Sequence, residues 1–261
     1  MSKLPVRRTL RSLPDWRLAG SYGALIHADR RAFAWEWLRR HEPYRRAWSS
    51  RACPATRFGL LTYADPDKSL REAKPMWTLE LDPGVLASWP ARSSRRGADD
   101  MFDVRTLRGV VSVEVDPQDI ECWLFSDGQW AIRLDIHEGT LLGGPVSLQY
   151  RLEGLASAEP SMLSLRRLVA LASRGTIPAG LLPQEPRAAR WVLELRTADA
   201  LASGASHSEM ALAFFKDAVA HKGWRSENAS YRLRIQRLVR AANRLLADPF
   251  DGPWFQGKRT K

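Results

Sequence analysis

The spacing of apolar residues changes along the chain, and each change predicts a different kind of element. Between residues 15 and 48, aromatic and aliphatic side chains recur at helical spacing. Phe33 and Trp37 form an i,i+4 pair on a helix predicted from about Asp29 to His41, which Pro43 is expected to end. Arginines interleave with these aromatics, so the segment is either a packed core or a surface that stacks on unpaired bases. Packed aromatics more often form a core, and the sequence favours that interpretation.

From Gly109 the apolar period becomes two, which is typical of strands. Asp127-Gly128 lies between two apolar runs and favours a type I′ hairpin turn, in which both central residues need positive φ. Two short strands are also predicted upstream, in a proline-rich block, over 58–63 and 76–81. The main pattern predicts an antiparallel meander of about four strands, over 109–115, 121–125, 130–136 and 146–152.

Helical periodicity returns after residue 158. Ser161 is a candidate N-cap for a helix that Gly175 stops, and a second helix is predicted from Pro186 to Gly204. The helices that follow the strands are available to cover one face of the sheet.

Two further helices are predicted near the C-terminus. Ser206 with Glu209 forms a capping box, which predicts a helix from His207 to about Lys216. A longer helix is predicted from about Ser226 to Leu246, and Pro249 stops it. Such a pair could form a helix-turn-helix, although the interruption between the two helices is longer than the usual turn.

The predicted fold class is α+β, with a small N-terminal helical module, a central antiparallel β-meander and a C-terminal helical bundle that carries a helix-turn-helix-like pair. The corresponding domain prediction is an N-terminal basic aromatic helical module at 1–52, a central β-rich region at 53–158, a C-terminal helical DNA-binding-like domain at 159–250 and a basic tail at 251–261.

The net charge of +11 is unevenly distributed. Residues 1–51 hold 12 Lys and Arg against 4 Asp and Glu, residues 52–186 hold 14 against 18, and residues 187–261 hold 14 against 7. Two basic ends therefore flank a mildly acidic middle, which indicates that the ends meet any polyanionic partner. Cys53 and Cys122 form neither a ligand pair nor a disulfide framework, which fits a reducing compartment.

The sequence predicts neither a membrane span nor an enzyme. It has no run of 18 apolar residues and no apolar segment typical of a secretory signal, so the expected location is the cytoplasm. Its five histidines stand in no metal-ligand spacing, no phosphate-binding loop or nucleophile elbow occurs, and no cofactor is expected. Acid pairs such as Asp99 with Asp100 are better explained as solvated loops.

The last predicted helix has the clearest candidate surface for function. One side of it carries an apolar stripe, and no acid lies between Asn228 and Ala247. Like charges three or four residues apart repel one another, and an anion relieves that repulsion. A guanidinium meets a phosphate with two parallel hydrogen bonds, so the phosphates of duplex DNA are the expected partner. The candidate phosphate contacts are Arg232, Arg234, Arg237, Arg240 and Arg244.

The first residues of a recognition helix reach base edges in the major groove. On this helix those positions hold Arg225, Ser226, Asn228 and Tyr231. Asn pairs with adenine and Arg with guanine, which makes these residues candidates for sequence recognition.

Both ends of the chain resemble a family of proteobacterial transcriptional regulators found beside conjugation genes and in integrative elements. At the N-terminal end the resemblance rests on Asp15-Trp16 and on AFAWEWLRRHEPYRRAW from Ala32 to Trp48. At the C-terminal end it rests on SHSEMALAFF at 206–215 and SYRLRIQRLVRAANRLL at 230–246. The two-module arrangement is similar to that of FseA-type regulators of integrative and conjugative elements. The resemblance implies an activator of mobile-element excision or transfer, and a small antiactivator as a partner.

These observations favour a non-enzymatic, DNA-binding transcriptional regulator whose last helix lies in the major groove of double-stranded DNA. The N-terminal module would then be a second DNA contact or a surface for RNA polymerase. The alternative is a protein-interaction module or antiactivator whose arginine stripe meets an acidic protein. A nuclease, the third hypothesis, would require a divalent metal ion.

Overall fold

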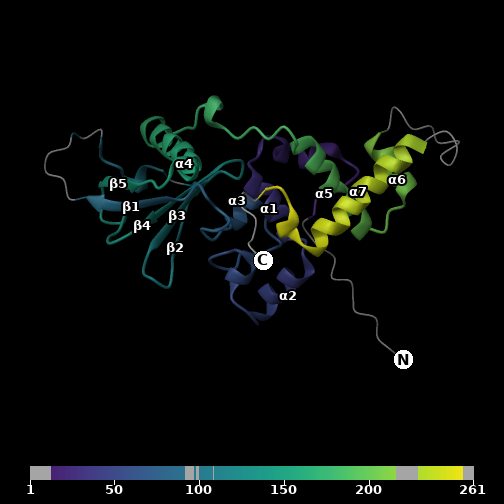
Figure 1. The fold of residues 1–261 in the computed structure, drawn as a ribbon, viewed down its shortest axis with the longest axis horizontal. Coiled ribbons are helices and arrows are strands. Elements are labelled where there is room, and N and C mark those ends of the chain that lie inside the picture. Colours follow the sequence, from purple (N-terminus) through teal and green to yellow (C-terminus); the bar gives the residue numbers. More distant parts are fainter. Residues whose placement is uncertain (1–12, 92–96, 98–99, 108, 216–228, 255–261) are drawn as a thin grey trace.

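The computed structural model describes residues 13–91, 97, 100–107, 109–215 and 229–254. At one end of the molecule a five-stranded sheet is covered by a long helix, and at the other end lies a group of helices from both ends of the chain (Figure 1). Helices precede the strands and follow them in the sequence, which confirms the predicted α+β class.

The N-terminal helices begin and end close to the predicted positions. The Asp29 side chain caps α1 (Arg30–Leu38) by accepting a hydrogen bond from the backbone N–H of Ala32. Helix α1 ends at Leu38, and Pro43 does not end it: Pro43 lies in the first turn of α2 (Glu42–Ser50), where a missing N–H costs nothing. The remaining elements before the sheet are the 3₁₀ helices η1 (Ala19–His27) and η2 (Ala55–Phe58) and the short helix α3 (Leu70–Ala73).

The aromatic residues of this region form a core, as the sequence predicted. Phe33, Trp35 and Trp37 are fully buried. Their ring partners come from distant parts of the chain: Phe33 meets Trp191 edge to face at 5.0 Å, and Trp37 stacks on Trp254 at 6.0 Å. Rings buried in this way cannot stack on bases.

The sheet has five strands in the order β2-β3-β4-β1-β5. Four of them match predicted strands, and β2, β3 and β4 form the predicted antiparallel meander. The sheet also contains a strand that was not predicted: β1 (Leu86–Ala91) lies between β4 and β5 and runs parallel to β4, so the sheet is mixed. The four predicted strands are β2 (Val111–Val115), β3 (Glu121–Ser126), β4 (Ala131–Ile136) and β5 (Ser147–Arg151).

Strand β1 contains Pro90, which has no N–H to donate and is rarely found inside a central strand. The register explains why it is tolerated. Strand β1 pairs with β4 only over Leu86–Ser88, so at Pro90 it has a single neighbour, β5. The structure describes residues 58–63 and 76–81 but has no full strands there, where two were predicted. It has one isolated antiparallel bridge there, between Leu60 and Trp77.

The turn between β3 and β4 differs from the predicted type I′ hairpin. Ser126 pairs with Ala131, so the connection contains four residues and not two. Gly128 has a φ of 94°, whereas Asp127 does not have a positive φ. The Asp127 carboxylate instead accepts hydrogen bonds from the backbone N–H groups of Gln129 and Trp130, at 2.8 and 3.2 Å. An Asx-type turn closes this hairpin.

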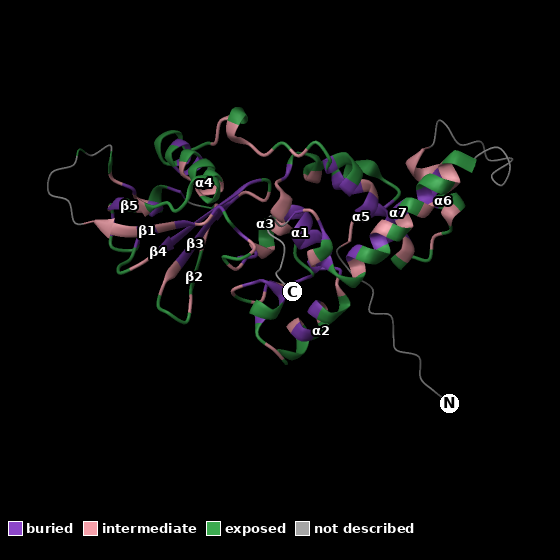
Figure 2. Ribbon diagram, in the orientation of Figure 1, coloured by how far each residue is buried: buried purple, intermediate pink, exposed green. Residues whose placement is uncertain are grey.

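One face of the sheet packs against α4 (Leu155–Arg174). Apolar residues from β4 meet Leu168 and Leu171 of α4 in one buried cluster, and the centre of the sheet is buried in Figure 2. Ser161 was expected to cap this helix, but α4 begins six residues earlier and includes Pro160. Gly175 ends it with a φ of 70°, as predicted.

Hydrogen bonds connect α1 to the sheet. Arg31 donates to the carbonyl of Ala131 at 2.8 Å and pairs with Asp82 at 2.6 Å. The backbone N–H of Asp29 donates to the carbonyl of Gln129 at 2.8 Å. Burial raises the pKa of Asp29 and outweighs the opposing effect of Arg31. The N-terminal helices are therefore held against both the sheet and the C-terminal helices.

Three consecutive helices follow the sheet and α4, as predicted. Helix α6 (His207–Phe214) ends slightly before the expected position, and residues 216–228 lie outside the described part of the chain. The expected interruption before the last helix and the start of that helix fall in this segment, and the predicted basic tail is described only through residue 254. The elements are α5 (Ala188–Ala202), α6 (His207–Phe214) and α7 (Ala229–Ala247), with the short 3₁₀ helices η4 (Val104–Thr106), η5 (Ala179–Leu181) and η6 (Pro249–Asp251) elsewhere.

Candidate nucleic-acid interface

The candidate interface is built on α7, whose orientation is fixed by its apolar side. Ile235, Leu238, Ala242 and Leu245 recur every three or four residues and are buried. They face α5 and α6, and the three helices contact one another in pairs. Because this stripe points inward, the opposite side of α7 faces solvent.

Helix α6 supports the N-terminal half of α7. The Ser206 side chain accepts from the backbone N–H of Glu209 at 3.2 Å, and Glu209 accepts from the Ser206 backbone N–H at 2.7 Å, so the predicted capping box is present. Just after α6, Phe215 lies 5.2 Å from the ring of Tyr231. The capped helix thus presents an aromatic contact that positions the first described turn of α7.

Four arginines of α7 are exposed: Arg234, Arg237, Arg240 and Arg244. Arg237, Arg240 and Arg244 follow the i, i+3, i+7 spacing that places them on one flank. Among the described residues, no acidic partner is present for Arg234, Arg237 or Arg240. Acids of the β-sheet do not neutralise this face of α7 in the part of the chain that the structure describes.

The contacts of these arginines are weak ones. Arg234 lies over the Phe215 ring at 4.4 Å, and Arg240 Nε donates to the carbonyl of Gln236 at 3.4 Å. Arg244 pairs with Asp251 at 3.1 Å, but both side chains are more than half exposed. An exposed ion pair contributes about 0–1 kcal/mol and weakens with salt, so a phosphate can replace Asp251 at little cost.

Other predicted site residues lie closer to the packed side or outside the described chain. Tyr231 is half-buried against Phe215, four residues before the buried Ile235. Arg232 is half-buried and makes a contact of its own. The predicted base-contacting residues Arg225, Ser226 and Asn228 lie outside the described residues.

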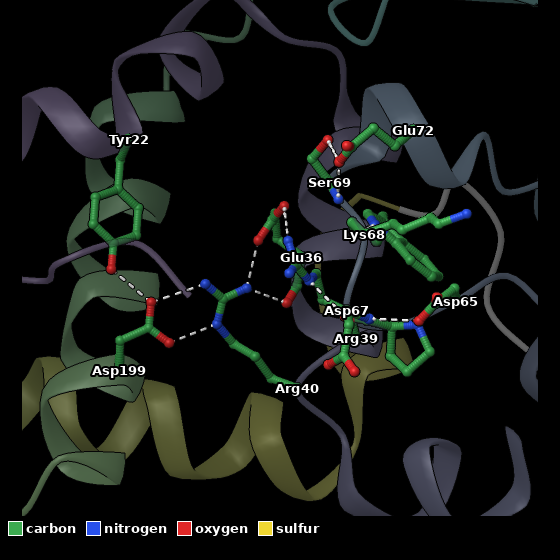
Figure 3. A network of polar contacts seen from close by, with 12 residues as sticks. Tyr22, Glu36, Arg39, Arg40, Asp65, Asp67, Lys68, Ser69, Glu72 and Asp199 are labelled. Carbon is green, nitrogen blue, oxygen red and sulfur yellow. Dashed lines mark hydrogen bonds and ion pairs between the residues drawn. The ribbon is translucent and has the colours of Figure 1, made fainter. Parts of the chain in front are cut away.

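A buried polar network behind the interface was not found by sequence reasoning. Arg40 donates to both oxygens of Asp199 on α5, at 2.7 and 2.8 Å, and also pairs with Glu36 (Figure 3). The Tyr22 hydroxyl donates to the same Asp199 carboxylate at 2.6 Å. The sequence contains one local indication of this network, the i,i+4 spacing of Glu36 and Arg40. Asp199 lies too far along the chain for any spacing to connect it with Arg40.

The network is electrostatically matched. Burial alone would raise the pKa of Glu36, but the guanidinium groups of Arg40 and Arg39 outweigh burial and hold that pKa below its usual value. Burial, and then the charge of Asp199, raise the pKa of Tyr22, so the phenol stays protonated and can donate. Glu36 and Tyr22 are therefore in the forms that their hydrogen bonds require, and the network fixes α5 against the N-terminal helices.

The described residues offer no group of three or more His, Cys, Asp or Glu side chains that could hold a metal ion. None of the described helices combines the length and apolar character that crossing a bilayer requires.

Two family models match the chain, one at each end. Residues 15–79 match the proteobacterial transcriptional regulator-like domain, and residues 154–249 match the DNA-binding domain described for a T6SS transcription factor. Both matches support a DNA-binding transcriptional regulator. The two matched families are a regulator domain and a DNA-binding domain, and both are non-enzymatic. The second match includes all of α5, α6 and α7, and with them the exposed arginines. No curated protein matches the chain.

Proposed function

We propose that this protein regulates transcription by binding double-stranded DNA through the exposed face of α7. The single observation that carries the proposal is that Arg234, Arg237 and Arg240 stand exposed, without acidic partners among the described residues, on a helix inside the matched DNA-binding region. An arginine face that serves only solubility would be interrupted by acids, because like charges at these spacings repel.

The spacing of the arginines suits a phosphate backbone. Arg237 and Arg244 are seven residues apart, which is about 10 Å along a helix axis, with Arg240 between them. Each guanidinium can donate two parallel hydrogen bonds to one phosphate. Such contacts set the position of a helix on the duplex and do not depend on sequence.

A salt titration on short duplexes tests the proposal. Binding that neutralises about four phosphates gives a log-log slope of roughly −3.6 between affinity and salt concentration. The double variant Arg237→Ala/Arg240→Ala should bind all duplexes more weakly and lower the magnitude of the slope by about 2.

The matched control removes two exposed arginines from the sheet end of the molecule. Arg105 and Arg151 are both more than half exposed and pair with nearby acids, so Arg105→Ala/Arg151→Ala causes the same change in net charge. Equal loss of affinity in both double variants would attribute binding to net charge and not to α7. Absence of duplex binding at about 50 mM salt would favour the alternative, in which the arginine face meets an acidic protein.

For sequence recognition, we propose that the N-terminal part of the last helix lies in the major groove, as part of a helix-turn-helix-like pair. Arg225, Ser226, Asn228 and Tyr231 would then be the base-contacting residues. Asn228→Ala should relax the sequences recovered when bound fragments are selected from random DNA, while Arg237→Ala should leave the recovered sequences unchanged. Identical recovery with both variants would place recognition elsewhere.

The biological role that we propose is activation of mobile-element excision or conjugative transfer, in the cytoplasm. The resemblance of both modules to FseA-type regulators supports it, and it adds RNA polymerase and a small antiactivator as partners. We also propose that the four sequence segments, with boundaries at residues 52, 158 and 250, correspond to functional units. Deletion of the gene should lower excision of a resident element, as measured by amplification across the empty attachment site; unchanged excision would contradict this role but not DNA binding.

A further inference from the structure

The outward face of α4 carries an apolar stripe that the fold does not use. Leu155, Met162 and Val169 are seven residues apart and are 97, 47 and 58% exposed. At 100° per residue, positions seven apart lie nearly above one another, so the three side chains form one line along the helix. Figure 2 shows this side of α4 as largely exposed.

The opposite face of α4 accounts for its attachment to the sheet. Leu168 and Leu171 are buried in the cluster under the sheet, and the Ser161 hydroxyl donates to backbone carbonyls of the segment before β1 at 3.2 Å. The stripe is therefore not needed to hold α4. Ala158 and Ala172 lie beside the stripe and leave room for the side chains of a second helix, whereas Leu165 packs toward the sheet cluster.

Two charges of opposite sign flank the stripe. Glu159 and Arg166 are exposed on the same side of it, and neither has an ion-pair partner among the described residues. Being seven residues apart, they are about 10 Å from one another along the helix, which is too far for a direct pair. A second helix that runs antiparallel would place an opposite charge beside each of them.

We infer that α4 pairs with α4 of a second copy of this chain, antiparallel and centred between Met162 and Leu163. This pairing places Glu159 of each copy beside Arg166 of the other, and Leu155 of each copy within one residue of the position opposite Val169 of the other. A two-fold contact must be self-complementary, and this arrangement of apolar and charged positions satisfies that requirement. A partner of another kind would not require Glu159 and Arg166 to lie at equal distances from the centre of the paired helices.

The paired helices form a small interface. The stripe from Leu155 to Val169 is about 21 Å long and contains three apolar side chains, so the dimer should be weak and should depend on concentration. The dimer carries two α7 faces related by a two-fold axis. If α7 binds DNA as proposed above, the dimer recognises two half-sites in inverted orientation.

Sedimentation equilibrium of the full chain without DNA tests the pairing. The unmodified protein should shift from monomer to dimer as its concentration rises. Glu159→Arg alone or Arg166→Glu alone should weaken self-association at least tenfold, because each places like charges together twice in the dimer. An equimolar mixture of these two single variants should associate as tightly as the unmodified protein, because every charge again meets its opposite.

Control variants separate this inference from misfolding and from the DNA-binding proposal. All residues substituted are exposed, so circular dichroism should be unchanged, and Leu79→Glu, at a site 60% exposed and far from α4 in sequence, should leave self-association unchanged. A monomer at every concentration, or a dimer that Glu159→Arg does not weaken, would overturn the inference. Failure of the mixture to associate would overturn the antiparallel register. Arg237→Ala/Arg240→Ala should lose DNA but keep the dimer, which distinguishes the two proposals.

Discussion

Two helices of this protein carry arginine clusters, and the clusters have opposite environments. At the end of α1, Arg39 and Arg40 are only 4 and 8% exposed and meet buried carboxylates. On α7, Arg237 and Arg240 are exposed and have no acidic partner among the described residues. Similar runs of arginine in a sequence thus serve as structure in one helix and as a free cationic surface in the other.

The difference follows from which carboxylates the fold supplies. Glu36 precedes Arg39 and Arg40 by three and four residues, so a helix places it beside both guanidinium groups. Asp199 arrives from α5 and completes the pairing of Arg40. Helix α7 has no acid of its own. In this protein an arginine cluster is buried where the fold supplies carboxylates and stays exposed where the helix has no acid of its own.

The comparison predicts that the largest loss of folding stability comes from substitution of Arg40. Arg40→Ala leaves Glu36 and Asp199 buried without their main partner, and such changes cost about 3–5 kcal/mol. We expect the free energy of unfolding in urea to fall by this amount. A loss within about 0.5 kcal/mol of zero would mean that the network is not structural.

A smaller effect is expected at Tyr22. Tyr22→Phe keeps the buried ring but removes the hydroxyl that donates to Asp199 at 2.6 Å. Hydrogen bonds to charged groups contribute about 1.5–3 kcal/mol, so unfolding in urea should shift by that amount. In an Arg40→Ala background the same substitution should have a different effect, because both residues bind one carboxylate. Strict additivity would contradict a shared network.

Acid should weaken the buried cluster in a defined direction. The pKa of Glu36 in the folded protein lies below its ordinary value of 4.5, so its contribution to stability is present above that value and is lost as the pH falls through the folded pKa. The difference in unfolding free energy between the unmodified protein and Glu36→Gln should therefore shrink below about pH 4.5. A difference that stays constant down to pH 3 would contradict the assignment.

The smallest effect on stability is expected on α7. Arg237→Ala removes an exposed side chain with no acidic partner among the described residues, so the unfolding free energy should change by no more than about 0.5 kcal/mol. The thermal unfolding midpoint in the absence of DNA should barely move. A large loss of stability would show that Arg237 has a structural role and would remove the contrast with Arg40.

Elements with clear periodicity could be predicted from the sequence. Strands β2 to β5 and helices α5 to α7 show their period directly, and Gly175 and the Ser206 capping box mark ends that the structure confirms. Strand β1 could not be predicted, because it lies in a proline-rich block and itself contains Pro90. The start of α4 was misplaced, because Ser161 has the side chain of a typical N-cap; the helix begins at Leu155, and the Ser161 hydroxyl donates to backbone carbonyls before β1.

The candidate site could be predicted in part. The buried stripe of α7 fixes which side is exposed, so the positions of Arg237 and Arg240 follow from periodicity alone. Periodicity identifies a buried face but not the element that covers it. The contact of Arg234 with Phe215 and the pairing of Arg40 with Asp199 could not be predicted, because each joins residues that are distant in sequence.

The aromatic face of α1 also has a consequence for the synthesis of the chain. The rings that cover Phe33 and Trp37 belong to Trp191 and Trp254, so the ribosome completes α1 long before its covering residues are made. At roughly 5–20 residues per second, the interval between Phe33 and Trp191 is on the order of ten seconds. During translation the nascent chain therefore displays uncovered tryptophans, a surface that chaperones bind, until the last helices emerge.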